Sequence, residues 1–269
     1  MIPRPDPEAR AWRVAGALFA GSAVGVTGLG VAWWAIGGAG FRTALASGGL
    51  FAASVLGFFV AHEAGHLLVA RWHRIAVGPP WFTPVGVVMH LREPPATRTG
   101  LLELGAAGPL AGFAALAALA VARLAWGGPM PPADPRLHLA TPLLWRVLAL
   151  PWGGGSVSAD DPVAAAFCVG ALVTALNLLP FGQLDGGHVA AALWPGRAVA
   201  ISWAITAVLL AAGFWWWGFA VWAAVIHLAG TRYPLRPRRE GQGPSRRARG
   251  VAVAAAVAFV LCATPAPFR

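Results

Sequence analysis

The sequence of 269 residues has no lysine, only two cysteines and few charged residues of either sign. Charged residues make up 11% of the chain, against about 25% in typical soluble domains. Hydrophobic residues make up 58%. This balance excludes an ordinary soluble domain and predicts a polytopic membrane protein.

The two cysteines, Cys168 and Cys262, both fall within apolar runs. At such positions a cysteine is typical of a small buried hydrophobic residue. Two isolated thiols of this kind predict neither a disulfide framework nor a cysteine-based metal site. The cysteine content therefore gives no indication of redox chemistry.

All 20 basic residues are arginine, which indicates a GC-rich coding genome and hence a bacterial source. The net charge of +10 would suit nucleic-acid binding, but the arginines follow the loops between apolar runs. Their densest cluster, at 232–249, flanks such a run, and basic segments next to a membrane usually contact anionic lipid headgroups. We therefore expect the lipid bilayer as a partner and no nucleic acid.

Seven apolar runs are present, most of them near the roughly 20 residues that cross a bilayer. They lie at about 11–37, 44–72, 100–126, 161–181, 198–212, 214–230 and 250–264. The stretch 198–230 is either a hairpin of two short spans or one tilted helix with an interfacial piece, and Gly213 favours the hairpin. The first run is too long for a signal-peptide core and is expected to be a retained helix. The predicted fold is an all-α polytopic membrane protein with six or seven transmembrane helices.

The arginines also predict the orientation of these helices. With the N-terminus in the cytoplasm and 198–230 as a hairpin, 15 arginines lie inside and five outside, which fits the positive-inside rule. The five outside are Arg42, Arg123, Arg136, Arg146 and Arg269. We predict an integral protein of the bacterial cell membrane with a cytoplasmic N-terminus.

No soluble domain of useful size interrupts the apolar runs. The segment from Pro79 to Pro95 contains two short extended pieces around Pro84-Val85-Gly86, which predicts a small membrane-associated β-hairpin near the active site. We divide the chain into an N-terminal transmembrane helix and loop, a catalytic membrane core, and C-terminal transmembrane helices with a basic cytoplasmic loop. Their expected ranges are 1–43, 44–196 and 197–269.

The sequence His62-Glu63-Ala64-Gly65-His66 lies inside the second apolar run. On a helix, two imidazoles four residues apart project from one face and can share a metal ion. The glutamate between them lies beside the open coordination position, where it can act as a general base. The alternative is a pair of hydrogen-bonded core histidines, and this spacing within a membrane segment favours the metal site.

A hydrolytic zinc site needs a third protein ligand, for which Asp185 is the best candidate. Glu103 follows an arginine-rich loop, where it would pair near the headgroups, and the acids at 160–161 suit a helix N-cap. Asp185 follows Pro180 and Gly182, which would break a helix at membrane depth. Such breaks are tolerated where the backbone lines a cavity, so the break and the carboxylate support one site. A packed structural carboxylate is the alternative.

Two further polar residues flank this aspartate. Asn177 could hydrogen-bond an extended substrate backbone or an oxyanion, although an asparagine that only bridges helices is equally consistent with the spacing. His188 lies close enough to Asp185 to contact it, but is expected to satisfy backbone carbonyls at a helix start.

Three segments resemble the site-2 protease family of intramembrane zinc metalloproteases. They are the motif at 62–66, the helix Gly108-Pro109-Leu110-Ala111-Gly112 with its preceding stretch 98–105, and Asn177-Leu178-Leu179-Pro180 leading to Leu184-Asp185-Gly186-Gly187. Their order and separation cover the region from about 60 to 190.

The resemblance implies that His62, His66 and Asp185 bind one Zn2+ per chain. It also implies that Glu63 is the catalytic acid and base, that Asn177 handles substrate, and that the site lies near the cytoplasmic side of the membrane. Many members carry a PDZ insertion before the aspartate segment or a regulatory domain after the core, and we expect neither here. The resemblance is thus to the bacterial type without a PDZ insertion.

The sequence as a whole predicts a zinc metalloendopeptidase that cuts in or near transmembrane segments of membrane-anchored regulatory proteins, or remnants of secretory signals. The alternative is a non-catalytic zinc-binding membrane scaffold or carrier. Glu63 favours the enzyme, because a structural zinc site closes the fourth coordination position and needs no base. A metal transporter would need several intramembrane acids or histidines along a path, and the sequence has one cluster.

Overall fold

The computed structural model describes residues 7–83, 86–132, 137–228, 234–239 and 241–268. Helices dominate these ranges, and the two strands they contain are adjacent in the chain. The elements in order are α1 (Pro7–Ile36), α2 (Phe41–Trp72), β1 (Val77–Thr83), β2 (Gly86–Leu91), α3 (Arg98–Trp126), α4 (Leu143–Ala149), the 3-10 helix η1 (Leu150–Trp152), α5 (Pro162–Leu178), α6 (Asp185–Leu193), α7 (Ala198–Ala212), α8 (Gly218–Leu228) and α9 (Arg246–Cys262).

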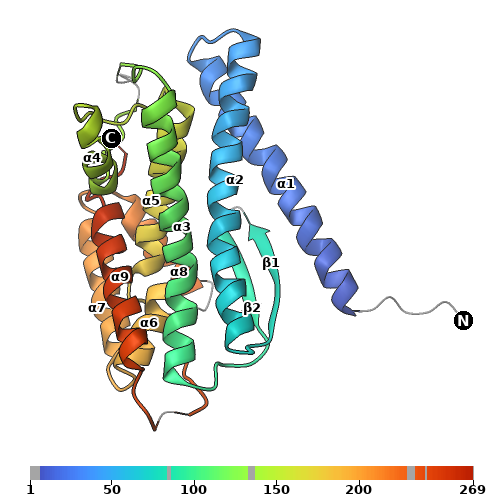
Figure 1. The fold of residues 1–269 in the computed structure, drawn as a ribbon, viewed down its shortest axis with the longest axis vertical. Coiled ribbons are helices and arrows are strands. Elements are labelled where there is room, and N and C mark those ends of the chain that lie inside the picture. Colours follow the sequence, from blue (N-terminus) through green and yellow to red (C-terminus); the bar gives the residue numbers. More distant parts are fainter. Residues whose placement is uncertain (1–6, 84–85, 133–136, 229–233, 240, 269) are drawn as a thin grey trace, which may run out of the picture.

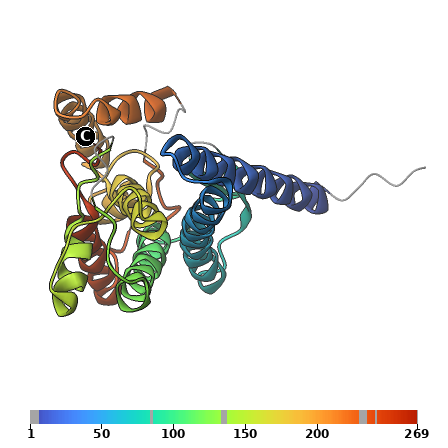
Figure 2. The same cartoon turned by 90° about the horizontal axis from the view of Figure 1, so that it is seen from above.

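Helices α2, α3 and α5 pack against one another and form the centre of the molecule. Helix α1 contacts α2 at one end and leans away from the bundle at the other, while α7 and α8 pack together on another flank (Figures 1 and 2). The predicted fold class, a helical membrane protein with a small hairpin, is confirmed.

Three of the described helices, α1, α2 and α3, are long and apolar enough to cross a membrane. Shorter apolar helices include α5, α7 and α8. The stretch 198–228 contains two helices in contact, α7 and α8, and not one continuous helix. That both of them cross the membrane remains a prediction.

Helices α2 and α3 approach closely through small residues. A Cβ atom added at Gly65 would collide with the backbone carbonyl of Ala107, and one added at Gly112 would lie 2.8 Å from the Phe58 ring. Such contacts are typical of membrane helices, in which small residues let backbones come together. The small-residue face of α3 thus presses directly on the helix that carries the histidines.

The polar ends of α3 and α5 are fixed by specific bonds. Thr97 caps α3 by accepting from the Gly100 amide, and Asp161 caps α5 by accepting from two amides of its first turn. Asp161 also forms a buried ion pair with Arg123 at the end of α3 (N–O distance 2.5 Å). The expected N-cap at 160–161 is therefore confirmed, and it joins α5 to α3.

Strands β1 and β2 form the predicted antiparallel hairpin, in which Phe82 pairs with Val87 and Pro80 with Met89. Residues 84–85 of the expected turn lie outside the described residues. The hairpin lies beside the half of α2 that ends at Trp72, and Phe82 packs edge-on against Phe19 of α1 (Figure 1). It therefore fills the angle between α1 and α2.

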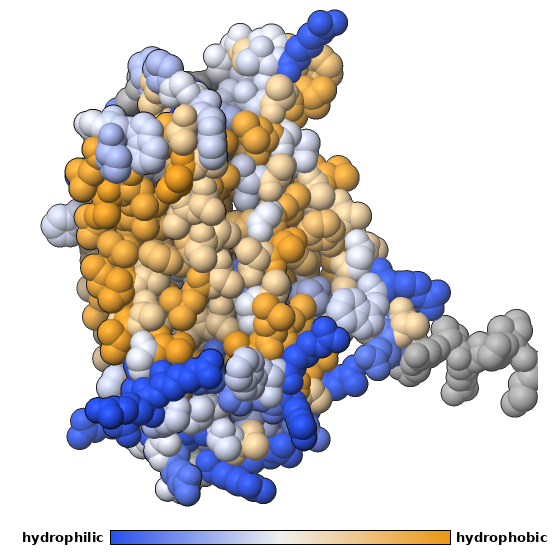
Figure 3. Space-filling view, viewed as in Figure 1, coloured by the Kyte–Doolittle hydropathy of each residue, from blue (hydrophilic) through white to orange (hydrophobic). Residues whose placement is uncertain are grey.

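Charged side chains gather at one end of the molecule, below a broad apolar band (Figure 3). The start of α1, the end of α2, the start of α3 and the start of α9 all lie at this end (Figure 1). Arg247 of α9 lies over the Trp72 ring at 5.2 Å, and Arg238 pairs with Glu93. This is the end that the arginine count assigns to the cytoplasm.

Candidate metal centre

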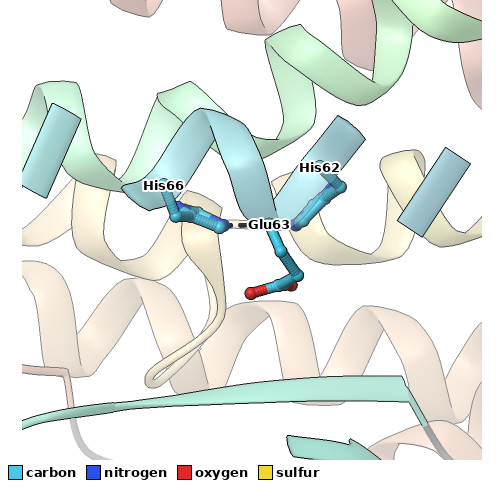
Figure 4. A group of neighbouring side chains, drawn as sticks. All are labelled: His62, Glu63 and His66. Atoms are coloured by element: carbon cyan, nitrogen blue, oxygen red, sulfur yellow. Dashed lines mark hydrogen bonds between the residues drawn. The ribbon is translucent and has the colours of Figure 1, made fainter. Parts of the chain in front are cut away.

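The motif at 62–66 lies on the second half of α2, and both of its imidazoles are buried. Their Nε2 atoms approach to 3.2 Å (Figure 4). The four-residue spacing places the two side chains one above the other on the same helix face. Two nitrogen atoms from one rigid helix thus point at the same volume.

Helix α6 brings Asp185 to this pair. Its Oδ2 atom lies 3.3 Å from Nε2 of His62, and its Oδ1 atom lies 3.3 Å from Nε2 of His66. Asp185 is the first residue of α6, which follows the break between Leu178 and the new helix. The structure therefore brings together the three residues proposed from the sequence as ligands.

Glycine is required at the start of α6. A Cβ atom at Gly186 would collide with the carbonyl groups of Leu178 and Leu179, and one at Gly187 would collide with that of Gly182. The chain can fold back this tightly only where the side chain is a hydrogen atom. The glycine pair therefore sets how closely Asp185 follows the end of α5.

The ring of His66 is oriented by α3. Its Nδ1 atom lies 2.9 Å from the carbonyl oxygen of Leu104, which can only accept a hydrogen bond. The proton is therefore on Nδ1, and the lone pair of Nε2 faces His62 and Asp185. Gly108 leaves room for the ring, because a Cβ atom there would collide with it.

The donor set fits zinc. Two ligand atoms held about 2.0–2.1 Å from a tetrahedral zinc ion lie roughly 3.3 Å apart. The Nε2 atoms of His62 and His66 lie 3.2 Å apart, and each lies 3.3 Å from a different carboxylate oxygen of Asp185. Two imidazole nitrogens and one carboxylate are also a ligand set that zinc accepts in hydrolytic enzymes. These three side chains would hold the ion, which would supply Lewis-acid activation of a bound water.

Glu63 lies between the histidines, and its side chain is buried. Its carboxylate extends from the helix on the side of the two imidazoles (Figure 4), and one of its oxygens has no hydrogen-bond partner. One donor atom each from Glu63, His62 and His66 lie within 4.8 Å of one another. Buried carboxylate oxygens normally have a hydrogen-bond partner. Since this oxygen has none in the protein, it is available to accept a proton from a small molecule at the centre.

Asn177 lies in the last turn of α5, next to the break that precedes Asp185, and is partly buried. His188 lies one turn into α6, where its Cβ borders Gly105 of α3. Glu103 accepts a hydrogen bond from Nε2 of His73 at 2.7 Å and is not brought to the centre; its partner is this histidine and not an arginine of the preceding loop.

Sequence reasoning missed the residues that support these groups. Arg98 donates to the carbonyl oxygens of Ala192 and Leu193 at the end of α6, at 2.7 and 2.8 Å. Ser202 of α7 accepts from the backbone of the segment before Asp185. A hydroxyl within an apolar run, shared with Thr206 of the same run, was the available signal for Ser202, whereas the carbonyl of Leu104 has no signature in sequence.

A histidine pair with its glutamate on one apolar helix, completed by an aspartate from a second helix, defines a membrane-embedded centre of the metallopeptidase type. The chain belongs to Peptidase family M50, whose family model matches residues 50–215. The predicted resemblance to site-2 proteases is thereby confirmed at the level of the family.

Curated relatives carry related names. The chain is 31% identical over 169 residues to the "Probable zinc metalloprotease EGY2, chloroplastic" of Oryza sativa subsp. indica, covering 56% of this chain and 30% of that protein. It is 33% identical over 171 residues to the EGY2 protein of Arabidopsis thaliana, covering 57% of this chain and 29% of that one. The chain thus spans under a third of the length of these relatives.

Among solved structures, the chain is similar to the site-2 protease from Methanocaldococcus jannaschii, with a TM-score of 0.41 and 13% sequence identity. The match covers 91% of this chain and 86% of that one.

Proposed function

We propose that this protein is an intramembrane zinc metalloprotease, which hydrolyses peptide bonds in or near transmembrane segments of membrane-anchored, regulatory proteins. The observation that carries the proposal is the convergence of His62, His66 and Asp185, with Glu63 beside them, on helices of the apolar bundle. The family and the names of the curated relatives support the same chemistry.

Each residue of the centre has a separate task. His62, His66 and Asp185 would hold one zinc ion, which would supply Lewis-acid activation of water and of the scissile carbonyl. The unpaired carboxylate oxygen of Glu63 takes a proton from the attacking water and later gives it to the leaving amine. Asn177, at the edge of the helix break, hydrogen-bonds the substrate backbone.

A transmembrane substrate must unwind locally before its peptide bonds can react, because a helix hides them behind its own hydrogen bonds. Helix-breaking residues in a substrate therefore favour cleavage. The β1–β2 hairpin, next to the motif helix, offers an edge along which the unwound segment can be held extended. If Val87→Pro and Met89→Pro leave cleavage of a helical substrate unchanged, the hairpin has no such role.

The proposed location is the bacterial cell membrane, with the N-terminus and the arginine-rich end of the molecule in the cytoplasm. The gathering of charged side chains at one end supports this orientation, because cytoplasmic loops carry the excess of arginine. The partners are then a membrane-spanning protein substrate and the bilayer itself.

The decisive experiment compares the wild type with Glu63→Gln on a fluorescent single-span substrate in liposomes, with zinc measured in both proteins. We expect about one zinc ion per chain in each and loss of cleavage only in the variant, because glutamine keeps the shape but cannot take the proton. Equal cleavage by both proteins would exclude Glu63 as the base. Bound zinc with no cleavage by the wild type across a substrate panel would favour the scaffold or carrier.

A further inference from the structure

Ser202 is a buried hydroxyl on α7, a helix that contributes no ligand to the proposed centre. Its Oγ atom lies 3.0 Å from the backbone nitrogen of Gly182 and 2.9 Å from the carbonyl oxygen of Ala198. Since a carbonyl can only accept, the hydroxyl proton goes to Ala198 and Oγ accepts from the Gly182 amide. One side chain thus joins α7 to the segment between α5 and α6.

Gly182 is the corner of that segment. Its φ angle is +52°, in the left-handed region that favours glycine. The neighbouring amides of Phe181 and Leu184 bond within the segment, to Leu179 and Phe181 respectively, at 2.7 and 3.0 Å. The amide of Gly182, in contrast, bonds to a side chain from another helix. The position of the corner is therefore coupled to α7.

The corner lies three residues before Asp185 and packs on the first turn of α6. The Gly182 carbonyl occupies the space where a Cβ atom of Gly187 would lie. A shift of the corner therefore moves the start of α6, where Asp185 must keep both carboxylate oxygens 3.3 Å from two imidazole nitrogens. Small displacements at this point separate the third ligand from the other two.

We infer that Ser202 is a positioning residue, which holds the Gly182 corner so that Asp185 reaches the two histidines. The inference rests on the zinc site of the proposed function. Removal of the hydroxyl leaves a buried amide without an acceptor, and the segment moves to find another partner. Partners behind metal ligands typically change metal affinity 10–100-fold. Because Ser202 acts through the backbone, the lower end of this range applies.

The chain offers a matched control one turn along α7. Thr206 is also buried, and its hydroxyl donates to the carbonyl of Ser202 at 3.0 Å, but this bond stays within the helix. Thr206→Val removes a hydroxyl from the same helix without touching the Gly182 corner. Ser202→Thr keeps an acceptor at the corner and serves as the rescue variant.

The test uses the full chain in lipid nanodiscs. Zinc affinity is measured by competition with a chromophoric chelator, and the ligand geometry by the visible absorption of the Co2+-substituted protein. We expect Ser202→Ala to raise the zinc dissociation constant about tenfold and to change the Co2+ bands. Thr206→Val and Ser202→Thr keep the wild-type values. The rise in melting temperature on adding zinc, measured for each protein against its own zinc-free form, is smaller in Ser202→Ala than in the wild type, Thr206→Val and Ser202→Thr.

Two outcomes overturn the inference, and they are distinguishable from each other. If the wild type binds zinc and Ser202→Ala keeps its affinity and Co2+ spectrum, or Thr206→Val changes them as much, Ser202 has no positioning role and the proposed function stands. If the wild type binds no zinc, both the inference and the proposed function fail.

Discussion

His62 and His66 lie on a helix of 32 residues, whereas Asp185 opens a helix of nine residues. The long helix is held by direct contact of its small residues with the backbone of α3. The short helix also packs on α3, where Gly105 faces its first turn, but it follows a broken segment and depends on further polar bonds from Arg98 at its end and from Ser202 to the segment before it. One side of the centre is thus fixed by packing along a long helix, and the other by a short packed helix together with a few hydrogen bonds.

This difference indicates which of the two ligand-bearing helices can shift when a neighbouring residue is changed. Packed backbones resist displacement, because a shift in either direction opens a void or creates a clash. A hydrogen bond, by contrast, can lengthen or exchange its partner. We therefore expect the aspartate side to tolerate change more gradually than the histidine side.

The largest effect is expected from removing the aspartate side altogether. In Asp185→Ala the two imidazoles remain in place, so the residual zinc affinity of the variant measures the contribution of the two histidines alone. We expect zinc affinity to fall by more than about 100-fold and cleavage to be lost, as with a chelator on the wild type. Zinc titration and cleavage assays measure both, and re-added zinc restores the chelated wild type. Unchanged zinc affinity in the variant would remove Asp185 from the ligand set.

The second effect tests the packed side. A Cβ atom at Gly108 collides with the His66 ring, so Gly108→Ala must turn the ring or separate α2 from α3. Overpacking of this kind costs about 1–3 kcal/mol, and we expect zinc affinity to fall about 30-fold. Gly49→Ala on α2 is the control, because its Cβ meets no atom within 4 Å. Equal zinc affinity in the two variants would contradict the packing argument.

A third substitution places the same added methyl group on the adjustable side. A Cβ atom at Gly105 would lie 2.6 Å from the carbonyl oxygen of Asp185 and 2.8 Å from Cβ of His188. Because α6 is short and can shift, we expect Gly105→Ala to lower zinc affinity only about fivefold, at the low end of the overpacking cost. Zinc titration beside Gly108→Ala measures the contrast. A larger loss at Gly105 than at Gly108 would reverse the comparison.

The smallest effect is expected at the far end of α6. Arg98→Gln removes the charged donor that bonds the carbonyls of Ala192 and Leu193, about two turns from Asp185. The loss is about 1 kcal/mol of unfolding free energy, with a two- to threefold change in zinc affinity. Denaturant titration and chelator competition measure the two quantities, with Arg13→Gln on an exposed face of α1 as the control. If Arg13→Gln has the same effect, the bonds to α6 are not its cause.

Most of the fold could be predicted because lipid imposes strong rules on sequence. Apolar runs, the hairpin at 77–91 and the histidine spacing each carry a local pattern that holds before any tertiary contact forms. Asp185 could be proposed because an acid after a helix break is rare at membrane depth. These features depend on residues that are close together in the chain, so the sequence alone is enough to predict them.

The supporting contacts could not be predicted, because their partners are distant in the chain or are backbone atoms. Ser202 bonds to a backbone amide 20 residues away, and Arg98 bonds to backbone carbonyls 94 and 95 residues away. The carbonyl of Leu104 orients His66, yet every residue has such a carbonyl. Only the packed structure selects which of these groups meets a ligand.

The hairpin beside α2 also has a consequence for solvent. A sheet of two strands leaves an outer row of amide and carbonyl groups on each strand, and hydrocarbon cannot satisfy them. Water must therefore reach this part of the protein, and the bilayer around it is expected to be thinned or indented. Because the hairpin lies beside the helix that carries the two histidines, water, one reactant of the proposed hydrolysis, is expected on this side of α2.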